Sequence, residues 1–76
     1  MARLPRISGR KAVKVFATFG WKGVRQGGSH IILVKEGASA TLSVPNHKEL
    51  ALGTLRSLIR AAGVKADDFV KAARKV

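Results

Sequence analysis

Apolar residues near the start of the chain recur at helical spacing. Four of them fall at positions i, i+3, i+4 and i+7 and so share one stripe of a helix: Ala12, Val15, Phe16 and Phe19. Ser8 stands where an N-cap is expected, and Gly20 stands where a helix usually ends. The pattern predicts a first helix between these two residues. Residues 1–7 contain Pro5 and no periodicity, so they are predicted to be a short lead-in.

The middle of the chain has the β-branched and alternating runs that are typical of strands. Three segments have this character: 21–26, 29–35 and 40–44. Gly27-Gly28 separates the first segment from the second, and residues 36–39 separate the second from the third. Both connections are short enough for antiparallel hairpins. We therefore expect an antiparallel sheet of three strands.

Helical periodicity returns after the strands. One apolar stripe consists of Leu55, Leu58, Ile59 and Ala62. Thr54 is the expected N-cap of this helix, and Gly63 is its expected end. The stripe of a last, shorter helix consists of Ala66, Phe69, Val70 and Ala73. Asp67 and Asp68 lie near the start of this helix and Lys and Arg residues lie near its end, an order that suits the helix dipole.

The predicted order of elements is therefore α-β-β-β-α-α. A chain of 76 residues has room for only one small core, and three consecutive strands cannot bury both faces of their sheet in such a core. We expect an α+β fold in which residues 1–76 form a single domain and the helices cover one face of the sheet. The opposite face is left for solvent or for a partner.

The charge of the chain is strongly unbalanced. It has 15 Lys and Arg against 4 Asp and Glu, a formal net charge of +11. Such a surface attracts polyanions, and the release of condensed counterions contributes to affinity for RNA or DNA. Solubility is the simpler explanation for any single basic residue, but the total favours nucleic acid as the partner. Hydrophobic residues make up 46% of the chain, which excludes a disordered basic tail.

Composition also bears on cofactors and on membranes. The chain has no Cys, which excludes a disulfide framework and a Cys-ligated zinc site. Its His and its scattered carboxylates have no metal-ligand spacing, so we expect neither a metal nor another cofactor. The longest apolar run, Ile31 to Val34, is far shorter than a membrane span. We therefore expect a cytoplasmic protein with no membrane partner.

Gly27-Gly28-Ser29-His30 is the segment best suited to chemistry. Glycine lets the backbone turn sharply or approach a phosphate, and histidine accepts and donates protons near neutral pH. These properties suit RNA cleavage, in which a base takes the proton of the 2′-hydroxyl, an acid protonates the leaving 5′-oxygen and cations stabilise the charged intermediate. A structural alternative explains the same segment as a hairpin turn and a strand histidine on the face of Ile32 and Val34. Turn and strand chemistry alone favour this alternative.

A second histidine, His47, follows the turn signal Pro45-Asn46. It is a candidate for the acid of a two-histidine pair, because two groups held in opposite protonation states would serve both steps of RNA cleavage. A solvated loop histidine is the simpler explanation.

Several segments occur in an order and spacing that chance does not explain. A predicted helix ends in Phe19-Gly20-Trp21, Gly28-Ser29-His30 follows, and Val44-Pro45 then precedes His47. The remaining segments of this set are Val24-Arg25-Gln26, Lys48-Glu49-Leu50, the run from Gly53 to Arg60, and Ala62-Gly63. Together they resemble the small toxins of the HicA family, also called the YcfA-like family, over most of the chain.

This resemblance implies a double-stranded-RNA-binding-domain-like fold, α-β-β-β-α, in agreement with the element order above. It also implies a toxin of a type II toxin-antitoxin module that cleaves mRNA and is blocked by a HicB-type antitoxin. The catalytic residue of the family is the histidine of the Gly-Ser-His motif, here His30. Many members have a second histidine directly after the motif, where this chain has Ile31.

The expected site then has His30 as general base or acid and a set of residues that position the RNA or its phosphates: Gly28, Ser29, Lys22, Arg25 and His47. For His47 a structural role and an RNA contact both stay open. The exposed sheet face and the basic surface are the expected docking area of the antitoxin.

Three functions remain open at this point. An endoribonuclease toxin would cut RNA but not DNA, because the reaction needs the 2′-hydroxyl. A non-catalytic RNA-binding module would recognise A-form RNA and would keep its activity without His30. A protein whose basic surface only meets an acidic partner would bind RNA weakly at physiological salt.

Overall fold

A computed structural model describes residues 3–76, apart from the side chain of Arg25. The elements are, in chain order, α1 (Gly9–Ala17), β1 (Lys22–Gly27), β2 (His30–Val34), β3 (Leu42–Pro45), α2 (Leu52–Ala62) and α3 (Ala66–Lys75). This order confirms the predicted α+β arrangement, α-β-β-β-α with an additional C-terminal helix. No helix within the described residues is both long enough and apolar enough to cross a membrane.

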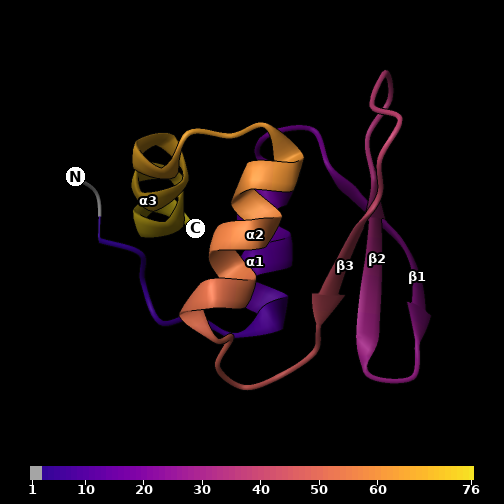
Figure 1. Ribbon diagram of the computed structural model, residues 1–76, viewed down its shortest axis with the longest axis horizontal. Coiled ribbons are helices and arrows are strands. Elements are labelled where there is room, and N and C mark those ends of the chain that lie inside the picture. Colours follow the sequence, from indigo (N-terminus) through magenta and orange to yellow (C-terminus); the bar gives the residue numbers. More distant parts are fainter. Residues whose placement is uncertain (1–2) are drawn as a thin grey trace.

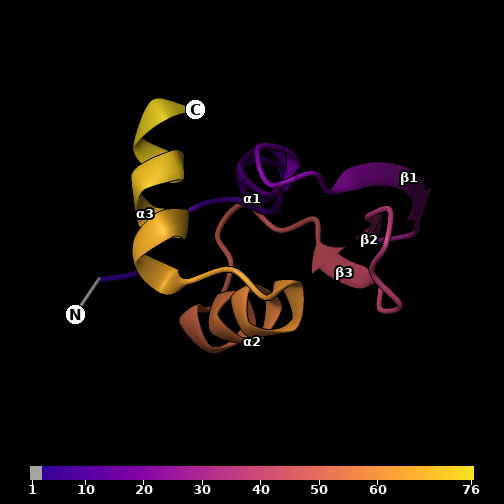
Figure 2. The same ribbon diagram turned by 90° about the horizontal axis from the view of Figure 1, so that it is seen from above.

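The molecule has three layers. The strands form an antiparallel sheet in the order β1-β2-β3. Helix α1 packs against β1 and β3, and α2 packs against β3, so both helices cover the same face of the sheet, as Figure 1 shows. Helix α3 contacts α1 and α2 and lies on their far side from the sheet (Figures 1 and 2). No helix of the described residues covers the other face of the sheet.

The alternation of buried and exposed residues along the strands follows from this one-sided packing. Leu33 of β2 pairs with Leu42 of β3, and both are buried against the helices. Neighbouring residues of a strand point to opposite faces, so Ile32 and Val34 lie on the open face together with His30. The predicted grouping of these three residues on one face therefore agrees with the register of the sheet.

Helix α1 begins as the sequence predicts. The Ser8 hydroxyl accepts a hydrogen bond from the backbone N–H of Lys11 at 3.0 Å, which satisfies one of the free amides of the first turn. Ala12, Val15 and Phe16 are fully buried. Phe19, the last residue of the predicted stripe, lies beyond the end of α1 in the following turn and is only half-buried.

The N-cap of helix α2 lies three residues before the predicted one. Thr54 lies inside the helix, and the N-cap is Ala51, which makes no side-chain capping bond. The preceding Leu50 explains the early start, because its side chain is buried and its backbone N–H donates to the carbonyl of Ile7 at 2.8 Å. A side-chain cap stabilises a helix by only about 1 kcal/mol, which is less than the burial of a leucine contributes. The predicted end at Gly63 is confirmed by its left-handed backbone, with φ of 73°.

Helix α3 is present, and its core-facing residues match the predicted stripe in part. Phe69 is fully buried and packs on Phe16 of α1, with ring centroids 5.0 Å apart and planes inclined at 52°. Ala73 also packs against the core as predicted, whereas Ala66, at the start of the helix, is exposed. Ala72, one helical turn from Phe69, packs against the core although the pattern did not place it on the stripe.

Candidate active site

The turn between β1 and β2 presents the Gly-Ser-His motif. Gly27 pairs with His30 as the last residue of β1, so the loop consists of Gly28 and Ser29 alone. The sequence pattern assigned the junction to Gly27-Gly28, one residue too early. Gly28 has φ of +59°, which suits the first central position of a two-residue hairpin turn. The sharp turn fixes Ser29 and His30 at the end of the sheet.

We expect Gly28→Ala to destabilise the protein by about 1–2 kcal/mol, because an L-residue with a side chain is strained at this positive φ. No atom outside the turn would touch the added methyl group, so the effect tests backbone strain alone. Gly27→Ala is the matched control, since Gly27 has neither a positive φ nor a close neighbour. Urea denaturation of both variants measures the difference, and equal stabilities would contradict the strained turn.

The His30 side chain is exposed at the start of β2 and has one defined polar neighbour. The Ser29 hydroxyl lies 3.3 Å from His30 Nδ1. This contact engages Nδ1 in either tautomer, as acceptor from the hydroxyl or as donor to it. The contact leaves Nε2 as the nitrogen that can exchange a proton with a bound molecule.

Two further segments meet the turn from distant parts of the chain. The backbone N–H of Asn46 donates to the carbonyl of Ser29 at 2.6 Å, and the N–H of Gly9 donates to the carbonyl of His47 at 2.9 Å. Pro45 is the strand partner of His30. The start of α1, the end of β3 and the hairpin turn therefore form one assembly around His30. The roles of Gly9 and Asn46 depend on backbone contacts between distant segments, and no residue pattern encodes such contacts.

The assembly brings His47 to the same end of the sheet as His30. His47 follows Pro45 by two residues, and its side chain is exposed. Both histidines are thus open to a ligand bound at this end.

Lys22 and Arg25 lie farther from His30 along the sheet. Lys22 pairs with Val34, four residues from His30 along β2, which corresponds to about 13 Å at the rise of a strand. Arg25 pairs with Ile32, and its side chain lies outside the described part. The structure does not bring Lys22 beside His30, so any phosphate that Lys22 contacts is a different one from the phosphate at the histidine.

Exposed cations surround the histidine end. Arg10 and Lys48 are exposed there, and Arg6 forms an ion pair with Glu49 in which Nη1 and Oε2 are 3.3 Å apart. Both partners of that pair are largely exposed, so it adds little to stability, but it neutralises the one carboxylate of this loop. Within residues 3–76, no three His, Asp or Glu side chains gather in a way that could hold a metal ion.

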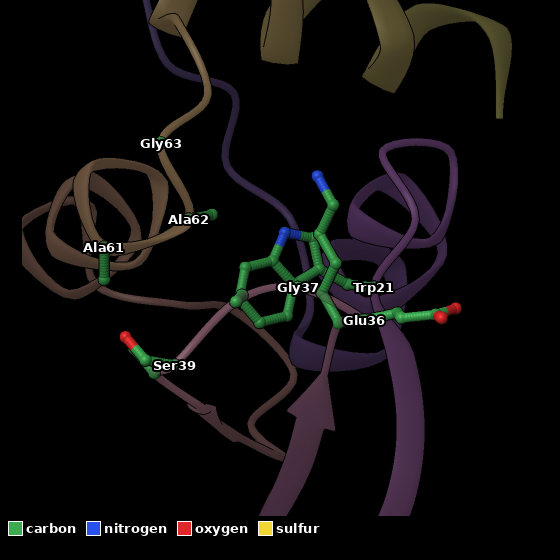
Figure 3. Close-up of a pocket in the computed structure, with 10 residues that line it drawn as sticks. Trp21, Glu36, Gly37, Ser39, Ala61, Ala62 and Gly63 are labelled. Atoms are coloured by element: carbon green, nitrogen blue, oxygen red, sulfur yellow. The ribbon is translucent and has the colours of Figure 1, made fainter.

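A separate recess of about 460 Å³ lies near the opposite end of the sheet, between the β2–β3 loop and the end of α2. Figure 3 shows the indole of Trp21 facing it, with Ser39 and Ala61 on one side and Glu36 on the other. Trp21 is buried, and its Nε1 has no hydrogen-bond partner within the described residues. Because the recess has neither histidine nor the exposed cations of the other end, the candidate for chemistry is the histidine end.

Comparisons with known proteins identify the family of the chain. The sequence model of a family described as the HicA toxin of bacterial toxin-antitoxin systems matches residues 9–64, which is more than half of the chain. Among solved structures, a chain of a toxin-antitoxin complex from Streptococcus pneumoniae is similar, with a TM-score of 0.69 and 30% sequence identity. The similarity covers 76% of this chain and 98% of that one. No curated protein sequence is significantly similar. The match over residues 9–64 includes the turn with His30 and the segments that meet it, and the chain therefore belongs to the HicA family of bacterial toxins.

Proposed function

We propose that this toxin is an endoribonuclease that cleaves mRNA and uses His30 as its catalytic residue. The observation that supports this most directly is the different surroundings of the two nitrogens of the His30 ring. Nδ1 is engaged by Ser29 at 3.3 Å, and the side chain is exposed, so that Nε2 has no hydrogen-bond partner among the described residues of a chain with a net charge of +11. A histidine oriented through one nitrogen and open at the other is suited to general acid-base catalysis.

The reaction that this arrangement suits is internal transesterification of RNA. His30 Nε2 takes the proton of a 2′-hydroxyl, the 2′-oxygen forms a bond to the adjacent phosphorus, and the bond from phosphorus to the 5′-oxygen breaks. A proton donor at the site then protonates the leaving 5′-oxygen. His47 lies at the same end of the sheet and is the donor that the structure offers.

The residues around His30 position the substrate in this proposal. The exposed turn of Gly28 and Ser29 lets a phosphate approach the backbone beside the imidazole. Lys22 and Arg25, farther along the hairpin, contact phosphates of the neighbouring nucleotides. We assign no metal to the reaction, since the proton transfers are given to histidine. An mRNA substrate also implies action in the cytoplasm.

An antitoxin of the HicB type is the proposed regulator. The similar Streptococcus pneumoniae chain comes from a toxin-antitoxin complex, which supports a protein partner for this toxin as well. The open sheet face offers half-buried Ile32 and Val34 beside His30, so a partner seated there would cover the histidine and exclude RNA.

The proposed function predicts that purified toxin cuts a long unstructured RNA in excess chelator and leaves DNA of the same sequence intact. RNA is cut because its 2′-hydroxyl is the nucleophile, and DNA is bound through its phosphates but lacks that group. A denaturing gel measures cutting, and a native gel measures binding.

The other outcomes separate the remaining functions. RNA that is retarded in the native gel but never cut would favour a non-catalytic RNA-binding module. Cutting only after addition of a divalent cation would contradict the assignment of both proton transfers to histidine.

A further inference from the structure

A second recess, of about 350 Å³, lies where the end of α1 meets α3. Its lining is Thr18, Phe19, Asp68, Lys71, Ala72 and Lys75. Phe16 and Phe69 are fully buried, whereas Phe19 is half-buried and lines this recess. Two exposed ammonium groups, on Lys71 and Lys75, lie one helical turn apart on its rim.

One side of the recess is formed by a part of the chain that the family comparison does not cover. The family match ends at residue 64, whereas α3 begins at Ala66. The similar solved chain corresponds to 76% of this one. Helix α3 is nevertheless an integral part of the fold, because Phe69 is fully buried against Phe16. The helix therefore adds a defined surface to the toxin.

The lining suits one nucleotide of a single strand. An open aromatic ring can stack on a base of any sequence, and lysine ammonium groups at the rim can neutralise the phosphates on either side. Asp68 is the single carboxylate of the recess. Two cations against one carboxylate leave the recess positive, as expected for an anionic ligand.

A row of cations along α1 connects this recess with the histidine end. The first residue of α1, Gly9, is bonded to His47, and the recess lies beyond the other end of the helix at Thr18 and Phe19. From residue 9 to residue 17 the helix axis rises by about 12 Å. Exposed Arg10 and Lys14 lie between these ends, and the Lys11 ammonium donates to the backbone oxygen of Val76 just after α3. Figure 2 shows α3 beside α1 on the side away from the sheet.

We propose that the recess between α1 and α3 is a second RNA-binding site, in which a base stacks on Phe19 and the flanking phosphates contact Lys71 and Lys75. This inference rests on the proposed function, because the bound RNA is the strand that His30 cuts. The strand runs from His30 around the end of the sheet and along α1. Helix α3 thereby lengthens the stretch of RNA that the toxin holds.

The test measures RNA affinity in a His30→Ala background, which keeps the RNA intact. In this background, Lys71→Gln with Lys75→Gln is expected to weaken binding of a single-stranded RNA of about 16 nucleotides by about tenfold. The slope of log affinity against log salt is expected to fall by about 1.4, since each lost phosphate contact removes about 0.7 for single strands. Binding of an RNA of about four nucleotides, too short to reach from His30 to the recess, is expected to stay unchanged.

The matched control removes the same charge from another helix. Arg56 and Arg60 are exposed and one turn apart on α2, and the pair Arg56→Gln with Arg60→Gln is expected to leave both RNA lengths nearly unaffected. An equal loss for the two double variants, or an equal loss at both RNA lengths, would overturn the proposal, because the lysines would then act only through the net charge.

Two single substitutions in the recess are expected to change RNA affinity in opposite directions. Asp68→Asn removes the carboxylate and is expected to strengthen binding of the longer RNA by about threefold. Phe19→Leu keeps an apolar contact with the core but removes the ring, and is expected to weaken binding by about fivefold. No gain for the first together with no loss for the second would overturn the site. Failure of the proposed function has a different signature, because the protein with native His30 would then not cut RNA at all.

Discussion

Replacement of His30 with alanine is expected to lower the rate of RNA cleavage by about 100-fold to 10,000-fold, the usual contribution of a general acid or base. RNA binding should stay within about threefold, because phosphate contacts supply most of the affinity for nucleic acid. The fold should be unaffected, since the side chain is exposed and, among the described residues, its one polar contact is the Ser29 hydroxyl. Single-turnover cleavage with toxin in excess separates the rate of the chemical step from binding.

His47→Ala tests the second proton transfer, because it removes the same side chain from the same end of the sheet. A loss as large as that of His30→Ala is expected, because His47 is the proposed proton donor. Weaker binding with a cleavage rate within about tenfold of the unmodified toxin would instead assign His47 to an RNA contact without proton transfer. Cleavage by His30→Ala at close to the unmodified rate would falsify the proposed role of His30.

The parts of the fold that the sequence predicted are those with strong local patterns. The stripe of Ala12, Val15 and Phe16, the N-cap at Ser8 and the left-handed Gly63 all follow from residues that lie within a few positions of one another. The predictions are wrong where contacts between residues far apart in the sequence determine the structure. Helix α2 starts at Leu52 rather than after Thr54 because Leu50 is anchored to the lead-in segment at Ile7.

In the candidate site, too, the consecutive residues could be predicted from the sequence and the contacts between distant segments could not. Gly28, Ser29 and His30 are consecutive, so a turn signal and a histidine were enough to find them. The meeting of this turn with Asn46 and Gly9 depends on how the first helix and the third strand pack, and no local pattern reports that. The recess between α1 and α3 could not be predicted either, because it also depends on how distant elements pack. The predicted stripe gave Phe19 to the core, and the residue does pack against the core, but it is only half-buried and also lines this recess.

The close contact of α1 with the end of β3 leads to a prediction of large effect at Gly9. A methyl group at this position would lie 2.0 Å from the backbone oxygen of Pro45 and 3.1 Å from the Cα of Asn46. Both neighbours are backbone atoms, so they cannot turn aside as a side chain does. We expect Gly9→Ala to destabilise the toxin by about 3 kcal/mol and to lower its melting temperature by more than about 10 °C, as measured by thermal unfolding in circular dichroism.

Gly53→Ala provides the control, because it makes the same chemical change in another helix. Gly53 lies in the first turn of α2 with no atom within 4 Å of an added methyl group and no positive φ. There the substitution should stabilise the toxin by about 0.4–1 kcal/mol, since alanine restricts the unfolded chain. The same gain is available to Gly9, so the sign of the Gly9→Ala effect depends on the clash alone. A stabilised Gly9→Ala variant would show that α1 does not press on Pro45, and the assembly of turn, strand end and helix around His30 would then lose its main support.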